Sequence, residues 1–347
     1  MRVALITPCY REGVRGNAVT VLRLEKYLRQ QGCDLSVFSL DEASTDRVVS
    51  SVIAGRFDLS HAFHGYLGGS IARAINTQGR MPFIITLTGS DIYEAMADRR
   101  HDETLANLTS ASAVVAFHEV VAARLGAEQP SIAQRMTVIP QGVELPELTH
   151  KLAAGQPGDE IVFLLPAGIR PVKDLISVLP TLAELHELHP ELRLRLAGPV
   201  LDQEYAAQLF DMLPDFPFAE YLGVVDHQEM GELYRNAAVV LNSSRFEGGM
   251  ANSLLEGMAW GRPLLASDVE GNRSLVKEGV NGFLYRDVSE LAVKAELLLT
   301  DPILRCRLGM AGRRMAEENH SPEQEALAYL RLYEQALRRA NSDSTQS

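Results

Sequence analysis

Disulfide frameworks, long apolar runs and an excess of basic residues are all missing from this sequence of 347 residues. Its 3 cysteines (Cys9, Cys33 and Cys306) form no CxxC pair, which argues against structural disulfides and against a cysteine-rich metal site. No stretch of 18 apolar residues occurs, so no membrane-spanning helix is expected. The net charge of −12 disfavours binding to nucleic acid or anionic membranes, and a peripheral membrane contact stays open.

The opening residues, MRVALITP, have the pattern of a buried strand, and no apolar signal-peptide region precedes a cleavage site. Together with the unpaired cysteines, this predicts a cytoplasmic protein with reduced thiols. Residues 1–140 carry 14 basic and 14 acidic side chains, so the whole acidic excess lies in the remainder. The first part of the chain is therefore the better place to bind an anion.

Short apolar runs alternate with amphipathic helical patterns along the chain. Val3–Thr7 has the pattern of a buried strand, and the helical period of Val19–Gln31 ends at Gly32. Continuous apolar strands separated by helices are typical of parallel sheets covered on both faces. The further strands expected are Leu35–Ser39, Leu59–Phe63, Phe83–Thr86, Ala113–Phe117, Thr137–Pro140, Ile161–Ala167, Leu192–Ala197, Ala219–Leu222, Ala238–Asn242 and Pro263–Ser267.

A polar stretch interrupts this alternation at Glu147–Glu160, which contains two glycines and a proline. Because the strand–helix pattern restarts after it, we expect two Rossmann-like domains, each a doubly wound α/β unit, at residues 1–147 and 155–320. A last amphipathic helix at 322–340 is expected to pack back on the first domain.

The most informative segment for function is Ser244–Gly261, SRFEGGMANSLLEGMAWG. It follows an expected strand and opens a helix, and its two glycines allow backbone amides to approach a ligand closely. A helix N-terminus favours a phosphate group, and the carboxylates of Glu247 and Glu256 can accept hydrogen bonds from sugar and ribose hydroxyls. From the pattern alone, a capped helix with two surface glutamates is an equally good interpretation.

This segment resembles the signature of the retaining glycosyltransferases of family 4, which have the GT-B fold: two Rossmann-like domains facing a cleft. The match runs through EGG…LLEGMAWGRPLLAS and continues in EGNRSLVKEGVNGF at Glu270–Phe283. Further matches are AGIRPVKD at Ala167–Asp174, LAGP at Leu196–Pro199 and VIPQGVE at Val138–Glu144. The resemblance therefore covers nearly the whole chain, and the motifs are specific for the superfamily only in combination.

The resemblance implies a role for several residues. Arg170 and Lys173 match the basic pair that grips the donor diphosphate, Glu256 matches the glutamate that binds the ribose, and Glu247 matches the glutamate near the donor sugar. Two cations facing an anion offset the charge that develops on the leaving group, so no metal and no cofactor are expected. The other implied donor-binding residues are Gly248, Gly249, Met250, Ala251, Gly223, Val224, Gly16 and Asn17.

Two features depart from the family pattern. Glu247 and Glu256 are nine residues apart, one more than is usual, which places an added residue in the glycine loop. In TLTGSD, Thr88 stands where the family has a histidine that touches the donor sugar. His118 follows a strand and is predicted to compensate in part, although a helix-capping histidine is the simpler interpretation. Asp91 of the same TLTGSD segment is the carboxylate expected to position the acceptor.

The acceptor is expected to be small and anionic, with Arg11 and Arg15 as candidate contacts unless they are only solvated loop residues. The segments GNAVTVLRLEKYLRQQG, TLTGSDIY and SSRFEGGMA resemble the branch that includes the bacterial selenosugar synthases. That branch implies a UDP-N-acetylhexosamine donor, UDP-GlcNAc above all, and a selenophosphate acceptor. The alternatives are a GT-B nucleotide-sugar epimerase and a non-catalytic nucleotide-sugar-binding protein.

Overall fold

The computed structural model describes residues 1–10, 16–93, 100–147 and 160–344. It divides the chain into two compact units, one formed by Met1–Gly142 with Ser321–Ser347 and the other by Val143–His320. Arg11, Arg15 and most of the expected linker lie outside the described residues. Among the residues described, no helix is long and apolar enough to cross a membrane.

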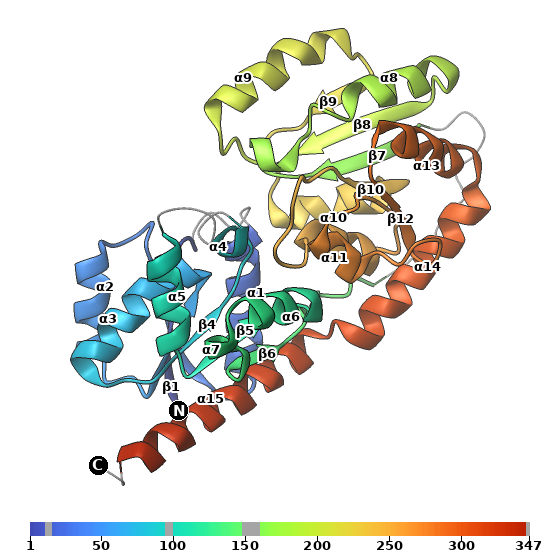
Figure 1. Ribbon diagram of the computed structural model, residues 1–347. Helices are drawn as coiled ribbons and strands as arrows, with labels where there is room; N and C mark the ends of the chain where they lie inside the picture. The colour runs from blue at the N-terminus through green and yellow to red at the C-terminus, as the bar shows by residue number, and fades with distance from the viewer. Residues whose placement is uncertain (11–15, 94–99, 148–159, 345–347) are drawn as a thin grey trace. The chain divides into compact units, whose positions relative to one another are not determined.

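The first unit is built on a parallel six-stranded sheet with the strand order β2-β1-β3-β4-β5-β6 (Figure 1). Its strands are β1 (Arg2–Thr7), β2 (Asp34–Ser39), β3 (Leu59–Phe63), β4 (Phe83–Thr86), β5 (Ala113–Ala116) and β6 (Met136–Val138). Its helices are α1 (Gly16–Gln30), α2 (Thr45–Ala54), the π-helix η1 (His64–Gly68), α3 (Gly69–Gly79), α4 (Ser90–Tyr93), α5 (His101–Ser110), α6 (Glu119–Glu128), α7 (Pro130–Ala133) and α15 (Pro322–Ser344).

Both faces of this sheet are covered, as the sequence predicted. Successive residues of β1 point to opposite faces, so Val3 and Leu5 pack in a core with residues of α1 and α15. Ala4 and Ile6 pack in a second core with residues of α2 and α3. This alternation explains why β1 is apolar throughout rather than at every second residue.

The second unit repeats the architecture with the strand order β12-β11-β10-β7-β8-β9 (Figure 1). Its strands are β7 (Ile161–Pro166), β8 (Leu192–Ala197), β9 (Ala219–Tyr221), β10 (Val239–Asn242), β11 (Leu264–Ser267) and β12 (Gly282–Tyr285). Its helices are the 3-10 turns η2 (Pro171–Lys173) and η3 (Leu213–Asp215), with α8 (Leu179–Leu188), α9 (Gln203–Met212), α10 (His227–Asn236), α11 (Asn252–Ala259), α12 (Glu270–Leu275), α13 (Val288–Thr300) and α14 (Pro302–Asn319). The two doubly wound α/β units confirm the expected fold class.

Buried polar contacts hold α15 against the rest of the first unit. Tyr333 is fully buried and its hydroxyl lies 2.8 Å from Nδ1 of His61, while Nε2 of His61 lies 2.7 Å from the Thr86 hydroxyl. The hydroxyl of Tyr329 lies 3.0 Å from that of Thr86. Burial lowers the pKa of His61 to about 3, so this histidine is neutral at physiological pH.

A buried ion pair also joins α15 to α1. Nε and Nη2 of Arg23 in α1 donate to the Glu325 carboxylate in α15 at 2.9 and 3.2 Å, and the backbone N–H of Gly142 donates to it at 3.0 Å. The Glu325 side chain is only 1% exposed. Protein groups therefore balance the negative charge of Glu325. Without this carboxylate, the Arg23 guanidinium would stay buried without its counter-charge.

The substitution Glu325→Gln should lower the free energy of unfolding of the first unit by about 3 kcal/mol, because it leaves Arg23 charged and buried. The matched control is Glu334→Gln on the same helix, where the carboxylate is 60% exposed and pairs with an exposed Arg338. That change should cost less than about 0.5 kcal/mol. Urea denaturation followed by circular dichroism measures both, and equal losses would contradict this role for the pair.

Candidate active site

The candidate site lies at the carboxyl ends of β7 and β10 in the second unit. These strands are neighbours in the sheet, and the chain leaves them in opposite directions, since β8 and β9 lie beyond β7 while β11 and β12 lie beyond β10. Loops at such a reversal of strand order diverge, which is why ligands of doubly wound sheets bind there. Figure 1 shows β7 and β10 side by side. The loop after β7 carries Arg170 and Lys173, and the loop after β10 carries Glu247.

Direct hydrogen bonds hold these two loops together. The hydroxyl of Ser243 donates to the carbonyl of Lys173 at 2.8 Å, and the backbone N–H of Arg245 donates to the carbonyl of Val172 at 2.9 Å. The Arg245 guanidinium also pairs with the Asp174 carboxylate at 3.0 Å. The positions of Lys173 and Glu247 are therefore set by a common framework.

The ammonium group of Lys173 forms an ion pair with Oε1 of Glu247, and both side chains are largely buried, at 19% and 13% exposure. The same oxygen accepts from the Ser244 hydroxyl at 2.8 Å and from Nδ2 of Asn242 at 3.5 Å. Burial alone would raise the pKa of Glu247, but the charge of Lys173 and these hydrogen bonds outweigh it and lower the pKa. Glu247 is therefore an anion at neutral pH that holds the lysine toward the loop.

Arg170 is the second cation of the site and carries a free charge. Its side chain is half-buried and makes no hydrogen bond or ion pair with any described residue. Its Nε is buried and is among the polar atoms that lack a partner. A guanidinium in this state favours an anion other than those of the described residues.

The glycine loop that follows Glu247 offers backbone amides without a partner among the described residues. Residues 248–251 are buried, yet none of their backbone N–H groups donates a hydrogen bond to a described residue. More than nine in ten buried backbone N–H groups in proteins are paired, so four consecutive amides with no partner among the described residues need a further acceptor. A phosphate or a sugar oxygen meets this requirement. Sequence reasoning assigned these amides to Gly248, Gly249, Met250 and Ala251.

The segment after β11 braces the glycine loop from behind. The backbone N–H of Gly271 donates to the carbonyl of Glu247 at 3.0 Å, and a Cβ at Gly271 would lie 2.3 Å from the carbonyl oxygen of Gly249. Nδ2 of the fully buried Asn272 donates to Oδ1 of Asn242 and to the carbonyl of Ser267, both at 3.0 Å. The glycine and asparagine of the EGN motif therefore shape the loop.

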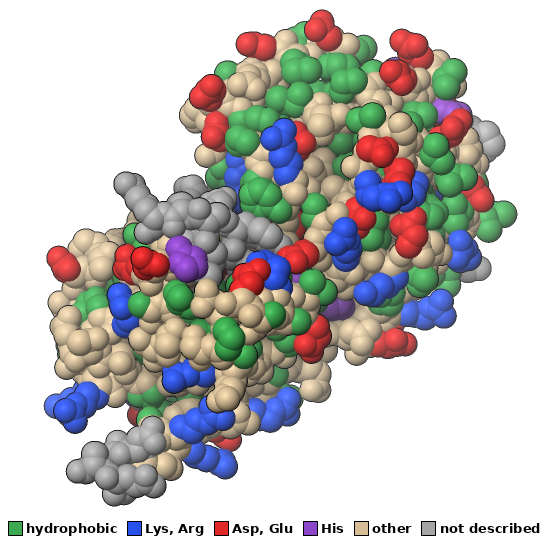
Figure 2. All heavy atoms as spheres, in the orientation of Figure 1, with side chains coloured by type: hydrophobic (Ala, Val, Ile, Leu, Met, Phe, Trp, Pro, Cys, Tyr) green, Lys and Arg blue, Asp and Glu red, His purple; other side chains and the backbone are tan. Residues whose placement is uncertain are grey.

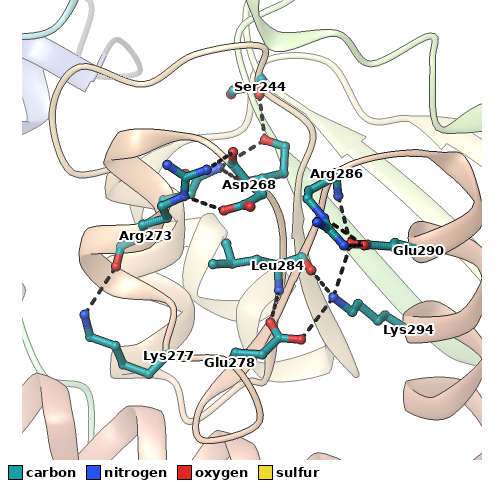
Figure 3. A network of polar contacts seen from close by, with 11 residues as sticks. Ser244, Asp268, Arg273, Lys277, Glu278, Leu284, Arg286, Glu290 and Lys294 are labelled. Atoms are coloured by element: carbon teal, nitrogen blue, oxygen red, sulfur yellow. Dashed lines mark hydrogen bonds and ion pairs between the residues drawn. The ribbon is translucent and has the colours of Figure 1, made fainter.

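Figure 3 shows how this brace continues into the rest of the unit. The hydroxyl of Ser267 donates to the carbonyl of Ser244 at 2.6 Å, and Arg273 pairs with Asp268 at 2.6 Å. Behind it, Glu278 accepts from the backbone N–H of Leu284 at 2.7 Å. The contacts of Asp268 and Arg273 hold the end of β11, and those of Glu278, Glu290 and Lys294 hold β12 and the residue after it.

The remaining predicted donor residues lie on two other elements of this unit. Glu256 lies on α11 beside the fully buried Tyr234, where burial first and then the negative charge of Glu256 raise the pKa of the phenol. Gly223 follows β9 with a φ of 76°, and its carbonyl accepts from the N–H of Gly198 at 2.9 Å. Val224 is 60% exposed. Because α11 begins at Asn252, Glu256 lies one turn into this helix, and the placement of an added residue in the glycine loop stays a prediction.

The first unit places a separate group of predicted residues together. Gly16 begins α1, and Nδ2 of Asn17 lies 3.5 Å from the hydroxyl of the half-buried Thr88. Asp91 is fully buried, and its carboxylate accepts from the backbone N–H groups of Gly65, Thr88 and Gly89 at 2.7 to 3.2 Å. These contacts give Asp91 a role in holding loops, and a contact of its own with an acceptor stays a prediction.

His118 has the geometry of a helix-capping residue, which was the simpler interpretation of the sequence. It is the N-cap of α6, is only 5% exposed, and its Nδ1 accepts from the backbone N–H of Val121 at 3.4 Å. A compensating contact with a donor sugar stays a prediction. Sequence reasoning missed Asn242, Ser244 and Asn272, although Asn272 lies inside a motif that it had matched.

Comparison with known proteins agrees with this geometry. Residues 160–301 match the family model for glycosyl transferases group 1. The match lies within the second unit, and the matched residues include Arg170, Lys173, Glu247 and Glu256.

Similarity to relatives extends beyond the residues that match the family model. Glycosyltransferase 1 domain-containing protein 1 of Xenopus tropicalis is 25% identical over 329 residues, which is 91% of this chain and 93% of that protein. D-inositol 3-phosphate glycosyltransferase of Thermobifida fusca is 26% identical, over 77% of this chain and 67% of the relative. Both likenesses span the two units.

Solved structures confirm the GT-B fold. Sucrose-phosphate synthase from Thermosynechococcus elongatus has a TM-score of 0.80 at 19% identity and covers 97% of this chain and 99% of its own. HepE of Anabaena, solved in complex with UDP-glucose, has a TM-score of 0.75 at 18% identity and covers 96% of this chain and 100% of its own.

The substitution Gly271→Ala should weaken UDP binding by about tenfold or more, because the added Cβ would displace the carbonyls of Gly249 and Glu247 and with them the glycine loop. The control is Gly312→Ala in α14, where a Cβ would make ordinary contacts at 3.5 Å. Calorimetric titration with UDP compares the two variants. Equal UDP affinity in both would show that the loop geometry does not matter for binding.

Proposed function

We propose that this protein is a retaining glycosyltransferase. In this proposal it transfers a hexose or N-acetylhexosamine from a nucleotide diphosphate sugar, with UDP-GlcNAc favoured, to a small anionic acceptor such as selenophosphate. The observation that carries the proposal is that residues 248–251 and the Arg170 side chain, on the loops after β10 and β7, have hydrogen-bond donors without a partner among the described residues. Structures of the same fold bound to UDP or UDP-glucose support a UDP donor, and the branch resemblance supports the acceptor.

Binding and leaving-group stabilisation follow from the two cations. Arg170 and Lys173 contribute two positive charges that bind the diphosphate. They stabilise it more strongly as the bond to the sugar breaks, because negative charge then develops on the leaving group. The diphosphate competes with Glu247 for Lys173. When the lysine turns to the phosphate, the Glu247 oxygen that it held becomes available to accept a hydrogen bond from a donor-sugar hydroxyl.

The transfer step needs no separate base. The acceptor attacks the anomeric carbon on the face that the leaving diphosphate departs from, so the new bond keeps the anomeric configuration. A phosphate oxygen of the leaving group takes the acceptor proton if there is one. With the charge supplied by Arg170 and Lys173, the proposal includes no metal and no cofactor.

The proposal includes a cytoplasmic location, and it has two rivals, an epimerase and a non-catalytic binding protein. Cys9 and Cys33 are buried and form no disulfide, and burial raises the pKa of Cys33 to about 11, which fits a reducing cytoplasm. An epimerase would change the nucleotide sugar without an acceptor, and a binding protein would release no UDP. Release of UDP that depends on added acceptor separates the transferase from both.

The double variant Arg170→Ala with Lys173→Ala should slow acceptor-dependent release of UDP from UDP-GlcNAc by roughly 10²-fold or more. The assay supplies selenophosphate as the acceptor and measures UDP with a coupled enzyme. The control, Arg307→Ala with Arg314→Ala, removes the same charge from exposed positions of α14 and should keep wild-type activity. A site variant that stays within a few-fold of wild type would contradict the electrostatic mechanism.

A further inference from the structure

Two loops at the carboxyl ends of β3 and β4 in the first unit are interlocked. The backbone N–H of Gly65, after β3, donates to Asp91, after β4, at 2.7 Å. Beside this bond, Nε2 of His64 lies 3.2 Å from the hydroxyl of Ser90. The order β2-β1-β3 means that the chain leaves β1 and β3 in opposite directions, the position at which a doubly wound sheet binds ligands.

His64 is held in an uncommon backbone conformation. Its φ is 76°, in the left-handed region, and it is 5% exposed. A histidine in this region costs on the order of 1 kcal/mol, so the surrounding contacts must maintain it. One such contact is Nδ2 of the fully buried Asn107, which donates to the carbonyl of Gly65 at 3.0 Å.

The contacts of His64 define which ring nitrogen carries the proton. Nδ1 accepts from the backbone N–H of Tyr66 at 3.2 Å and from that of Leu67 at 3.1 Å. A nitrogen that accepts from two N–H groups has no proton of its own, so in the neutral ring the proton lies on Nε2. The bond to Ser90 therefore runs from Nε2–H of His64 to Oγ of Ser90.

This direction fixes what the Ser90 hydroxyl can do. Because Oγ accepts from His64, its own proton points elsewhere and can be donated. Within residues 1–10, 16–93, 100–147 and 160–344, Ser90 Oγ has no other hydrogen-bond partner, and the residue is only half-buried. Asp91, the adjacent carboxylate, is fully buried and accepts backbone N–H groups with both oxygens, so it does not compete for this proton.

We infer that Ser90 is an acceptor-binding residue that donates its hydroxyl proton to an oxyanion of the acceptor, and that His64 is the residue that orients this hydroxyl. The inference rests on the proposed function and names the group that meets the acceptor. The chemical class it selects is a phosphate-like anion. A neutral acceptor hydroxyl would gain less from such a donor, because hydrogen bonds to charged groups are the stronger ones.

Inorganic phosphate serves as the probe, in protein with Arg170→Ala and Lys173→Ala so that the donor site binds it more weakly. With ¹⁵N-labelled histidine, His64 should show an unprotonated Nδ1 and a protonated Nε2, and phosphate should shift the Nε2–H resonance. Adding Ser90→Ala should weaken phosphate binding by roughly tenfold, and Ser90→Thr, which keeps the hydroxyl, should restore it. His64→Asn, which suits a positive φ, should weaken binding as Ser90→Ala does.

Three results would overturn the inference. They are an Nε2–H resonance of His64 that phosphate does not shift, an unchanged phosphate affinity in the Ser90→Ala variant, and a proton on Nδ1 of His64. UDP titration of the otherwise wild-type protein keeps the two proposals apart. If UDP binds and phosphate does not, only the role of Ser90 fails. If phosphate binding depends on Ser90 and UDP does not bind, only the proposed donor fails.

Discussion

The ion pair between Lys173 and Glu247 is the interaction on which the site depends. It joins the loops after β7 and β10 where the strand order reverses, and both partners are largely withdrawn from water. A buried pair of this kind contributes little net stability, since the cost of removing both charges from water offsets their attraction. The pair holds a cation and a carboxylate in place within one loop framework, and in the proposed mechanism an incoming diphosphate separates them.

The surrounding polar network makes this arrangement rigid before any ligand arrives. Asn242, Ser244, Ser267 and Asn272 form hydrogen bonds with one another and with loop carbonyls, whereas the amides of residues 248–251 have no partner among the described residues. A site whose donors are already in place loses little free energy to reorganisation when charge develops. In the first unit, buried contacts of Asp91 and of α15 give the loops after β3 and β4 a comparable framework.

The sequence predicted those parts of the structure that depend on local pattern. Buried strands such as β1 and β10 are continuous apolar runs, and the two doubly wound units follow from their alternation with helices. It missed β12, whose four residues follow Gly279 and Asn281 and resemble a turn motif. Lys173 and Glu247 were each found by motif, but their pairing joins residues 74 apart and depends on strand order. Asp91 and His118 were judged by position alone, and their backbone partners could not be predicted without the fold.

Backbone hydrogen exchange of residues 248–251, followed by NMR with and without UDP, tests the central claim most directly. The account predicts that these unpaired amides exchange more slowly when UDP is bound, because the diphosphate and sugar supply their missing acceptors. The buried amides of β5 in the first unit should exchange at the same rate in both samples. Unchanged exchange at residues 248–251 under saturating UDP would contradict the account, because the nucleotide would then be bound elsewhere.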